Sequence, residues 1–187
     1  MGPETAMATR TALPTICLLG VVLDNLTTAE ALDRISVSLV EKRGGWVFTP
    51  NLDILRRLTI DPEYATLTSA ATLRLADGMP LVWASRLQGT PLPERVAGSE
   101  LIWTLAERAA SDRRSVFLLG GNPGTADKTA SKLRAANPAL NILGTECPPL
   151  GFEKDDRYLK DLENRLVSMA PDICILGLPS LKQDRLI

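Results

Sequence analysis

The sequence predicts a single α/β domain whose sheet is mostly parallel and flanked by helices. From residue 115 onward, strand patterns and amphipathic helix patterns alternate, which favours parallel strands joined by right-handed crossovers. The 187 residues suffice for one well-buried core, and no internal repeat or domain-scale linker divides them. Aromatic residues are scarce at 4% while alanine and leucine abound, which suits helices packed on a sheet. The expected fold is therefore Rossmann-like.

In the amino-terminal half, short strand patterns are interleaved with helix signals. Residues 14–24 are strongly apolar and predict one or two short strands interrupted near Gly20. Thr27 or Thr28 can cap a helix whose first turn contains Glu30, and the glycine pair that follows ends this helix. The other elements expected in this half are a strand at 46–48, helices at 53–58 and 62–69, a strand at 73–76 and a helix at 81–87.

The carboxyl-terminal half begins with a Gly- and Pro-rich loop, after which Ser99 is expected to cap a helix through Ala109. The elements expected after it are strands at 115–119, 140–145 and 173–178 and helices at 126–136 and 157–169. Residues 1–12 are expected to be a disordered or vector-derived tail, so that the domain covers 13–187. The last residues only begin a helical pattern, and we therefore expect a C-terminal segment to be missing.

Composition and charge exclude several function classes. The formal net charge is −1, so the chain as a whole offers no basic field for a nucleic acid. The start lacks the pattern of a signal peptide, and the apolar run at 13–23 is about half the ~20 residues of a membrane-spanning helix. Cys17, Cys147 and Cys174 are widely separated and the chain has no histidine, so no zinc site is expected. Cys17 and Cys174 lie in apolar strand patterns, which predicts small core residues in a reducing cytoplasm.

Asp77 is the first candidate for chemistry. It follows a strand pattern and precedes Gly78, so its carboxylate is expected at the carboxyl end of a strand, where open α/β sheets bind ligands. Without histidine, a general base has to be Asp, Glu, Lys, Tyr or Cys. Asp-Gly is also a common turn dipeptide, and spacing alone favours that simpler interpretation.

A glycine-rich turn provides a candidate phosphate site. Gly120, Gly121 and Gly124 separate a strand pattern from a helix pattern, where backbone N–H groups can approach a diphosphate. Glu146 ends the next strand, at the place of a ribose-binding acid in a Rossmann unit. The pattern is neither G-x-G-x-x-G nor a P-loop, and an ordinary tight turn explains it equally well.

Other polar residues at strand exits also have ordinary interpretations. Thr49 and Asn51 flank a proline and can be no more than a turn and a helix cap. Arg95 lies in a loop and by default is a solvated charge, and residues 182–185 can be the polar start of a helix.

Taken together, six segments resemble the WecG/TagA/CpsF family of bacterial glycosyltransferases. The similarity runs from about Leu18 to Asp184, which is most of the chain. Because the segments occur in the family's order, the match is far more specific than any single glycine loop. They are TPNLDIL at 49–55, LADGMPLVWASRLQG at 75–89, ERVAGSEL at 94–101, VFLLGGNPGTA at 116–126, PPLGF ending at Phe152, and ILGLPSLKQD at 175–184.

The resemblance implies an inverting transferase that moves an N-acetylhexosamine-type sugar, or a related hexose, from a UDP-sugar to a sugar on undecaprenyl diphosphate. Such enzymes make cell-wall or surface polysaccharide as cytoplasmic, peripheral proteins at the inner face of the bacterial cytoplasmic membrane. The implied partners are the UDP-sugar donor, the polyprenyl-diphosphate-linked acceptor and the membrane surface, which the missing C-terminal segment is expected to touch. No nucleic acid is expected, and homo-oligomerisation is left open.

Carried over by motif, Asp77 is implied to be the catalytic base that deprotonates the acceptor hydroxyl. Thr49, also assigned to catalysis, and Asn51 are implied to line the pocket. Arg95 is implied to offset phosphate charge, and Gln183 to contact donor or acceptor.

The donor is expected near Gly120, Gly121 and Phe152, with Glu146 as a further substrate-binding residue. A D-x-D motif is missing from the sequence, so we expect no metal and no other cofactor. Stabilisation of the departing UDP then falls to Arg95, Lys182 and backbone amides.

Two departures from the family pattern keep alternatives open. The last motif usually reads P-K-Q-E, whereas Leu181 and Asp184 here replace the proline and the glutamate. A nucleotide-sugar-binding module without catalysis is one alternative. Another nucleotide-dependent enzyme, such as a dehydrogenase, is a second, disfavoured because G-x-G-x-x-G is missing.

Overall fold

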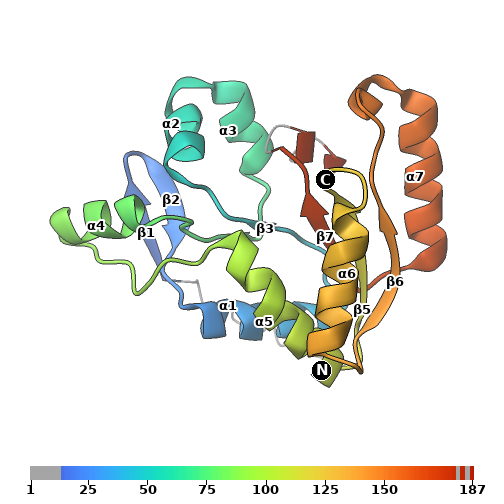
Figure 1. Ribbon diagram of the computed structural model, residues 1–187. Coiled ribbons are helices and arrows are strands. Elements are labelled where there is room, and N and C mark those ends of the chain that lie inside the picture. The colour runs from blue at the N-terminus through green and yellow to red at the C-terminus, as the bar shows by residue number, and fades with distance from the viewer. Residues whose placement is uncertain (1–13, 180–181, 184–185) are drawn as a thin grey trace, which may run out of the picture.

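The computed structural model describes residues 14–179, 182–183 and 186–187, which form the expected α/β fold (Figure 1). Its strands are β1 (Thr15–Leu18), β2 (Val21–Asp24), β3 (Val47–Phe48), β4 (Leu73–Arg74), β5 (Ser115–Gly120), β6 (Asn141–Glu146) and β7 (Ile173–Gly177). Its helices are α1 (Thr28–Val40), α2 (Leu52–Ile60), α3 (Pro62–Thr68), α4 (Met79–Leu87), α5 (Gly98–Ser111), α6 (Thr125–Ala136) and α7 (Asp156–Met169), with a 3₁₀ turn, η1 (Phe152–Lys154). The predicted fold class is confirmed.

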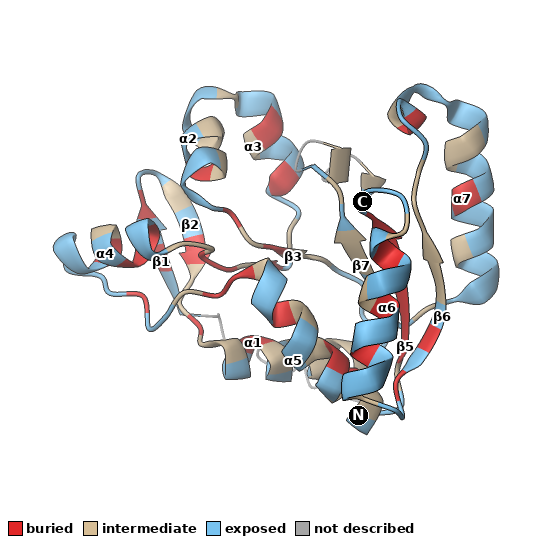
Figure 2. Cartoon of the chain, viewed as in Figure 1, coloured by how far each residue is buried: buried red, intermediate tan, exposed pale blue. Residues whose placement is uncertain are grey.

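The carboxyl-terminal half is built on a parallel sheet in the order β6-β5-β7. The central strand β5 is buried along its whole length, as expected for a parallel strand covered on both faces. Val116 and Leu118 point toward α5 and α6, and Phe117 and Leu119 point toward α7. Figure 2 shows the buried strand between the inner sides of these helices.

The amino-terminal half contains a second, smaller parallel pair, β3 and β4, and the antiparallel hairpin β1–β2. The hairpin places Ile16, Leu18 and Leu23 inward, where they meet the buried side of α4 and Leu55 of α2. Asp24, at the end of β2, accepts a hydrogen bond of 2.7 Å from the Arg74 backbone N–H, which ties the hairpin to β4.

Helix α5 joins the two halves. Near its start, Leu101 packs with Leu73, Leu75 and Ala31 in the core of the amino-terminal half. Further along, Ala106 and Ala109 pack on the face of β5. One helix therefore sets the position of the β3–β4 strand ends relative to the β5 sheet.

The sequence signals for helix ends succeed at α1 and fail at α5. Thr27 and Glu30 form the capping box expected before α1. Ser99, however, does not cap α5, because this helix already begins at Gly98 with Ala97 as its N-cap and with no side-chain cap. The Gly98 backbone N–H instead donates to the Asp77 carboxylate.

The expectation that two cysteines are core residues is wrong. Cys17 and Cys174 are both exposed. In the hairpin, Cys17 lies opposite Val22 and alternates with the inward Ile16 and Leu18, so its side chain points outward.

Candidate active site

The ends of β3 and β4 bring two distant segments side by side. Beyond the last paired residues the parallel hydrogen bonding continues, since Leu75 N–H donates to Phe48 C=O at 2.8 Å. Asp77 N–H in turn donates to Pro50 C=O at 3.0 Å. Asp77 therefore lies next to the segment from Thr49 to Asn51, at the carboxyl ends of both strands.

The start of α5 completes this cluster. Val96 N–H donates to Ala76 C=O at 2.9 Å, which places the following turn against the end of β4. The Gly98 backbone N–H donates to the Asp77 carboxylate. A Cβ at Gly98 would lie only 2.9 Å from Thr49 Oγ1, so glycine permits this close approach. Thr49, Asp77 and Gly98 thus meet at one point.

The environment of Asp77 favours the protonated form of its carboxyl group. Desolvation by partial burial raises its pKa above the ordinary value of 3.8. The Gly98 N–H and the charge of Arg95 act in the opposite direction, and the charge of Glu100 adds to the rise. A raised pKa is the property expected of a carboxylate that takes up a proton near neutral pH.

Arg95 contributes positive charge beside Asp77. Its guanidinium forms an ion pair with Glu100, in the first turn of α5, and about one third of the Arg95 side chain is exposed. The preceding residue, Glu94, accepts a hydrogen bond of 2.5 Å from Thr28 N–H and so fixes this loop to the start of α1. Arg95 is accordingly positioned but still accessible.

Asn51 has a structural task in this cluster. Its side-chain oxygen accepts a hydrogen bond of 3.0 Å from Ile54 N–H and caps α2. The simpler of its two sequence interpretations is therefore confirmed, and contact with a substrate remains a prediction.

The glycine-rich turn after β5 is shaped by its neighbour β7. A Cβ at Gly120 would lie 2.7 Å from the backbone of Gly177, so the two strands could not approach as they do. Gly121 N–H donates to Gly177 C=O at 2.7 Å, and this amide is therefore occupied. Gly124 has a φ of +78° and is the N-cap of α6. Binding of a diphosphate at this turn stays a prediction, with Gly121 N–H already satisfied.

Glu146 lies at the end of β6, as expected, and its carboxylate is engaged by α7. It accepts hydrogen bonds from Tyr158 Oη at 2.6 Å and from Arg165 at 2.5 Å. Burial, and then the hydrogen bond to Glu146, raise the pKa of the Tyr158 hydroxyl, which therefore stays protonated and donates. A role for Glu146 on a ribose stays a prediction.

The segment after β7 contacts the loop that contains Phe152. Lys182 lies 5.8 Å from the centre of the Phe152 ring and forms an ion pair of 2.7 Å with Glu153. Gln183 N–H donates to Pro179 C=O at 3.0 Å, which places this residue one turn after β7. The structure thus brings Lys182 to Phe152, and contact of Gln183 with a substrate stays a prediction. Leu181 and Asp184 lie outside the described residues.

Several residues of these clusters were missed by the sequence analysis. Gly98 and Glu100 border Asp77, and Tyr158 and Arg165 hold Glu146. A signal existed for the first pair, because Arg95 and Glu100 lie in the segment ERVAGSEL. The second pair lies on an exposed amphipathic helix, where charged residues are ordinary.

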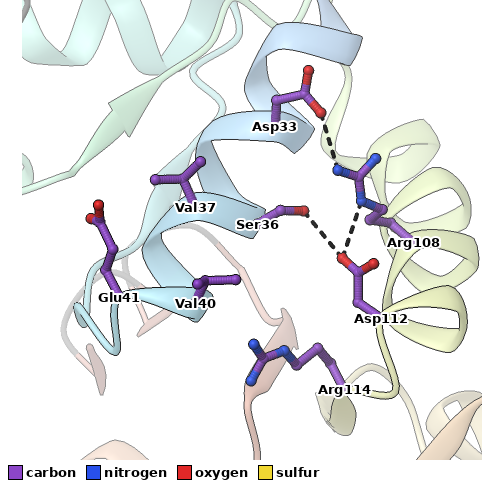
Figure 3. Close-up of a pocket in the computed structure, with 8 residues that line it drawn as sticks. All are labelled: Asp33, Ser36, Val37, Val40, Glu41, Arg108, Asp112 and Arg114. Atoms are coloured by element: carbon purple, nitrogen blue, oxygen red, sulfur yellow. Dashed lines mark hydrogen bonds and ion pairs between the residues drawn. The ribbon is translucent and has the colours of Figure 1, made fainter.

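The hollow in Figure 3 lies away from Asp77. It has a volume of about 590 Å³ between α1 and the last turns of α5. Arg108 there is neutralised by Asp33 at 3.2 Å and by Asp112 at 3.1 Å. Ten residues of helix separate Arg108 from Gly98, roughly 15 Å along the axis. This seam therefore joins two helices and is no part of the candidate site.

The described part of the chain offers neither a metal cluster nor a membrane-spanning helix. Among those residues, no group of three or more Cys, Asp or Glu side chains is placed to hold a metal ion. Within the same ranges, no helix is both long and apolar enough to cross a membrane.

Comparison with known proteins gives consistent matches. The profile of the family described as "Glycosyl transferase WecG/TagA/CpsF family" matches residues 16–187. The N-acetylglucosaminyldiphosphoundecaprenol N-acetyl-beta-D-mannosaminyltransferase of Bacillus spizizenii is 28% identical over 140 residues, 75% of this chain and 52% of the relative. The protein of the same name from Staphylococcus aureus (strain NCTC 8325 / PS 47) is 29% identical over 177 residues, 91% of this chain and 65% of the relative. The chain therefore spans between half and two thirds of the length of these relatives.

Proposed function

Because the chain belongs to the WecG/TagA/CpsF family of glycosyltransferases, we propose that it transfers a sugar from a UDP-sugar to a sugar carried by undecaprenyl diphosphate, with inversion. The relatives' names specify an N-acetylmannosaminyl group and an N-acetylglucosaminyl-diphosphoundecaprenol acceptor. A donor sugar of N-acetylhexosamine type is therefore the first to be tested. Such an acceptor would be met at the inner face of the cytoplasmic membrane.

The observation that carries this proposal is the cluster of Asp77, Thr49 and Gly98 at the carboxyl ends of β3 and β4. In an inverting transfer, an acceptor hydroxyl oxygen attacks the anomeric carbon while the bond from that carbon to the UDP oxygen breaks. The hydroxyl proton goes to the Asp77 carboxylate, whose raised pKa suits it to accept a proton. Thr49 would orient the attacking group from the adjoining strand end.

The departing UDP gains negative charge, which needs stabilisation. The charge of Arg95 acts on Asp77, and the ion pair of Arg95 with Glu100 would be shared with or exchanged for a phosphate. Lys182 and Phe152 would act on the other side, near the ends of β5 and β6. Since these cations can take the role of a metal ion, we propose that the transfer requires no divalent metal.

The test measures UDP binding and turnover separately. UDP should raise the melting temperature of the chain and NAD should not. A panel of UDP-sugars with a polyprenyl-diphosphate-linked N-acetylglucosamine acceptor should show acceptor-dependent UDP release that EDTA does not abolish. Stabilisation by NAD alone would contradict the proposal, and loss of transfer in EDTA with rescue by Mg²⁺ or Mn²⁺ would contradict metal independence. UDP binding in a full-length protein that cannot transfer would favour the non-catalytic alternative.

A further inference from the structure

Helix α4 is apolar on its outer side as well as on its inner side. Leu81, Val82 and Ser85 are buried and face the hairpin and α2. Met79, Trp83 and Leu87 follow one another at intervals of four residues, which places them on one side of the helix. Their exposed fractions are 39%, 60% and 92%. We call these three residues the α4 stripe.

A surface helix of a globular protein normally turns polar residues to the solvent. The segment from Gly78 to Pro93 instead contains one charged residue, Arg86, and no acid, in a chain that is 23% charged. The adjoining hairpin, residues 14–23, has no charged residue at all and exposes Leu19 and Val22. In Figure 1, α4 and the hairpin together form one end of the molecule.

The helix is held firmly in place, so the exposure of the stripe is built into the fold. Ser85 Oγ accepts a hydrogen bond of 2.9 Å from Leu92 N–H and donates to Val82 C=O at 2.8 Å. Gln88 Nε2 donates to Cys17 C=O at 2.7 Å, which ties the end of α4 to the hairpin. Neither the loop after α4 nor the hairpin covers the stripe.

We propose that the α4 stripe binds the surface of a lipid bilayer. A tryptophan and a leucine beside an arginine, in a segment from Gly78 to Pro93 that contains no acid, is the composition of a helix that lies in the interface between lipid headgroups and acyl chains. Arg86 complements anionic headgroups, and the lack of acids from Gly78 to Pro93 limits repulsion from them.

The position of the stripe relative to Asp77 supports a bilayer as the occupant. Gly78, the residue after Asp77, is the N-cap of α4, so the stripe begins directly beside the candidate base. If the proposed function holds, the acceptor is a lipid whose diphosphate lies at the membrane surface. With α4 on that surface, Asp77 would lie at the level of the headgroups, where the acceptor hydroxyl is found.

Sedimentation with vesicles tests this directly, on the 187-residue chain and without any acceptor lipid. Binding to vesicles of phosphatidylcholine and phosphatidylglycerol should fall about tenfold or more in Trp83→Glu and in Leu87→Glu, because each change removes a large apolar side chain from the contact. Trp103→Glu is the matched control, since Trp103 is 42% exposed on α5, and it should bind as the unchanged chain does.

Fluorescence gives a second measurement that does not depend on added charge. A variant with Trp46→Phe and Trp103→Phe retains Trp83 alone, and its emission should shift to the blue and be quenched by brominated lipids. The variant that retains only Trp103 should show neither effect. Melting temperature and the stabilisation by UDP should be unchanged in all variants, which separates this inference from the proposed function.

Three results would overturn the inference. One is a chain that does not bind vesicles while it still binds UDP. Another is equal loss of binding in the Trp83 and Trp103 variants. The third is a fall in the molecular mass of the free chain in Trp83→Glu, measured by light scattering, because the stripe would then join two copies of the chain.

Discussion

The ends of β3 and β4 and the ends of β5 and β6 present opposite arrangements of polar groups. At the first, Asp77 is partly buried with a raised pKa, and its neighbours Thr49, Gly98 and Arg95 come from separate segments. At the second, Gly121 N–H is bonded to Gly177 and Glu146 is bonded to Tyr158 and Arg165. In the region with the more familiar motif, a glycine-rich turn, the Gly121 N–H and the Glu146 carboxylate are thus already bonded within the protein. The Asp-Gly turn is a common dipeptide that indicates little by itself, yet it holds the carboxyl group whose pKa is raised.

The largest expected effect lies in the first region. Asp77→Asn should reduce turnover by roughly 10²–10⁴-fold, the usual contribution of positioned proton transfer. Asparagine keeps an oxygen that can accept from Gly98 N–H, so the melting temperature and UDP affinity should barely change. Turnover at saturating donor is the measurement. A stable variant with near-normal turnover would remove Asp77 from the mechanism and end the functional contrast between the regions.

In the second region, substitution of Gly120 should lower the stability of the fold, and stability is the property to measure there. Gly120→Ala should lower the free energy of unfolding by about 3 kcal/mol, because the new Cβ meets the Gly177 backbone and the residue has a φ of +115°. Gly124→Ala is the control: its φ is +78° but nothing lies within 4 Å, so only about 1–2 kcal/mol is expected. Urea unfolding of both variants measures the difference, and equal losses would show that the β7 contact contributes nothing.

The interpretation of Glu146 can be tested through its partner. Tyr158→Phe should cost about 1 kcal/mol of stability, the net contribution of the hydrogen bond to Glu146. The same substitution should cost less in a chain that already carries Glu146→Gln, because the charged acceptor is then missing. UDP affinity should stay unchanged if Glu146 only holds α7. A marked loss of UDP affinity would give Glu146 a part in donor binding and bring the two regions closer in function.

The smallest expected effect is the pH dependence of stability from Asp77. Its folded-state pKa lies above the ordinary 3.8, so the folded chain holds the proton more tightly than the unfolded chain. This group therefore favours the folded state below pH 3.8 and loses that contribution as pH rises through the raised pKa. The melting temperature of Asp77→Asn relative to the unchanged chain should accordingly increase over this window. A difference that is constant with pH would mean that Asp77 is not desolvated in the folded chain.

The parts of the fold that follow local rules could be predicted from the sequence. The capping box at Thr27 and Glu30, the hairpin broken at Gly20, and Asp77 at a strand end all depend on neighbouring residues. The contacts of Gly98 with Thr49 and of Gly121 with Gly177 could not be predicted, because these partners are distant in the sequence. Ser99 was misplaced as a cap for the same reason, since the helix begins where Gly98 meets Asp77.

The double attachment of α5 has a consequence for recombination between relatives. Leu101 belongs to the core of the amino-terminal half, while Ala106 and Ala109 belong to the core under β5. A chimaera joined in the loop before α5, or in the turn after it, would separate one set of contacts from its native partners. A junction in the middle of the helix, between Leu101 and Ala106, would leave both sets with their parent. Shuffled libraries of this family should therefore yield more folded proteins from crossovers inside α5 than from crossovers in the loops beside it.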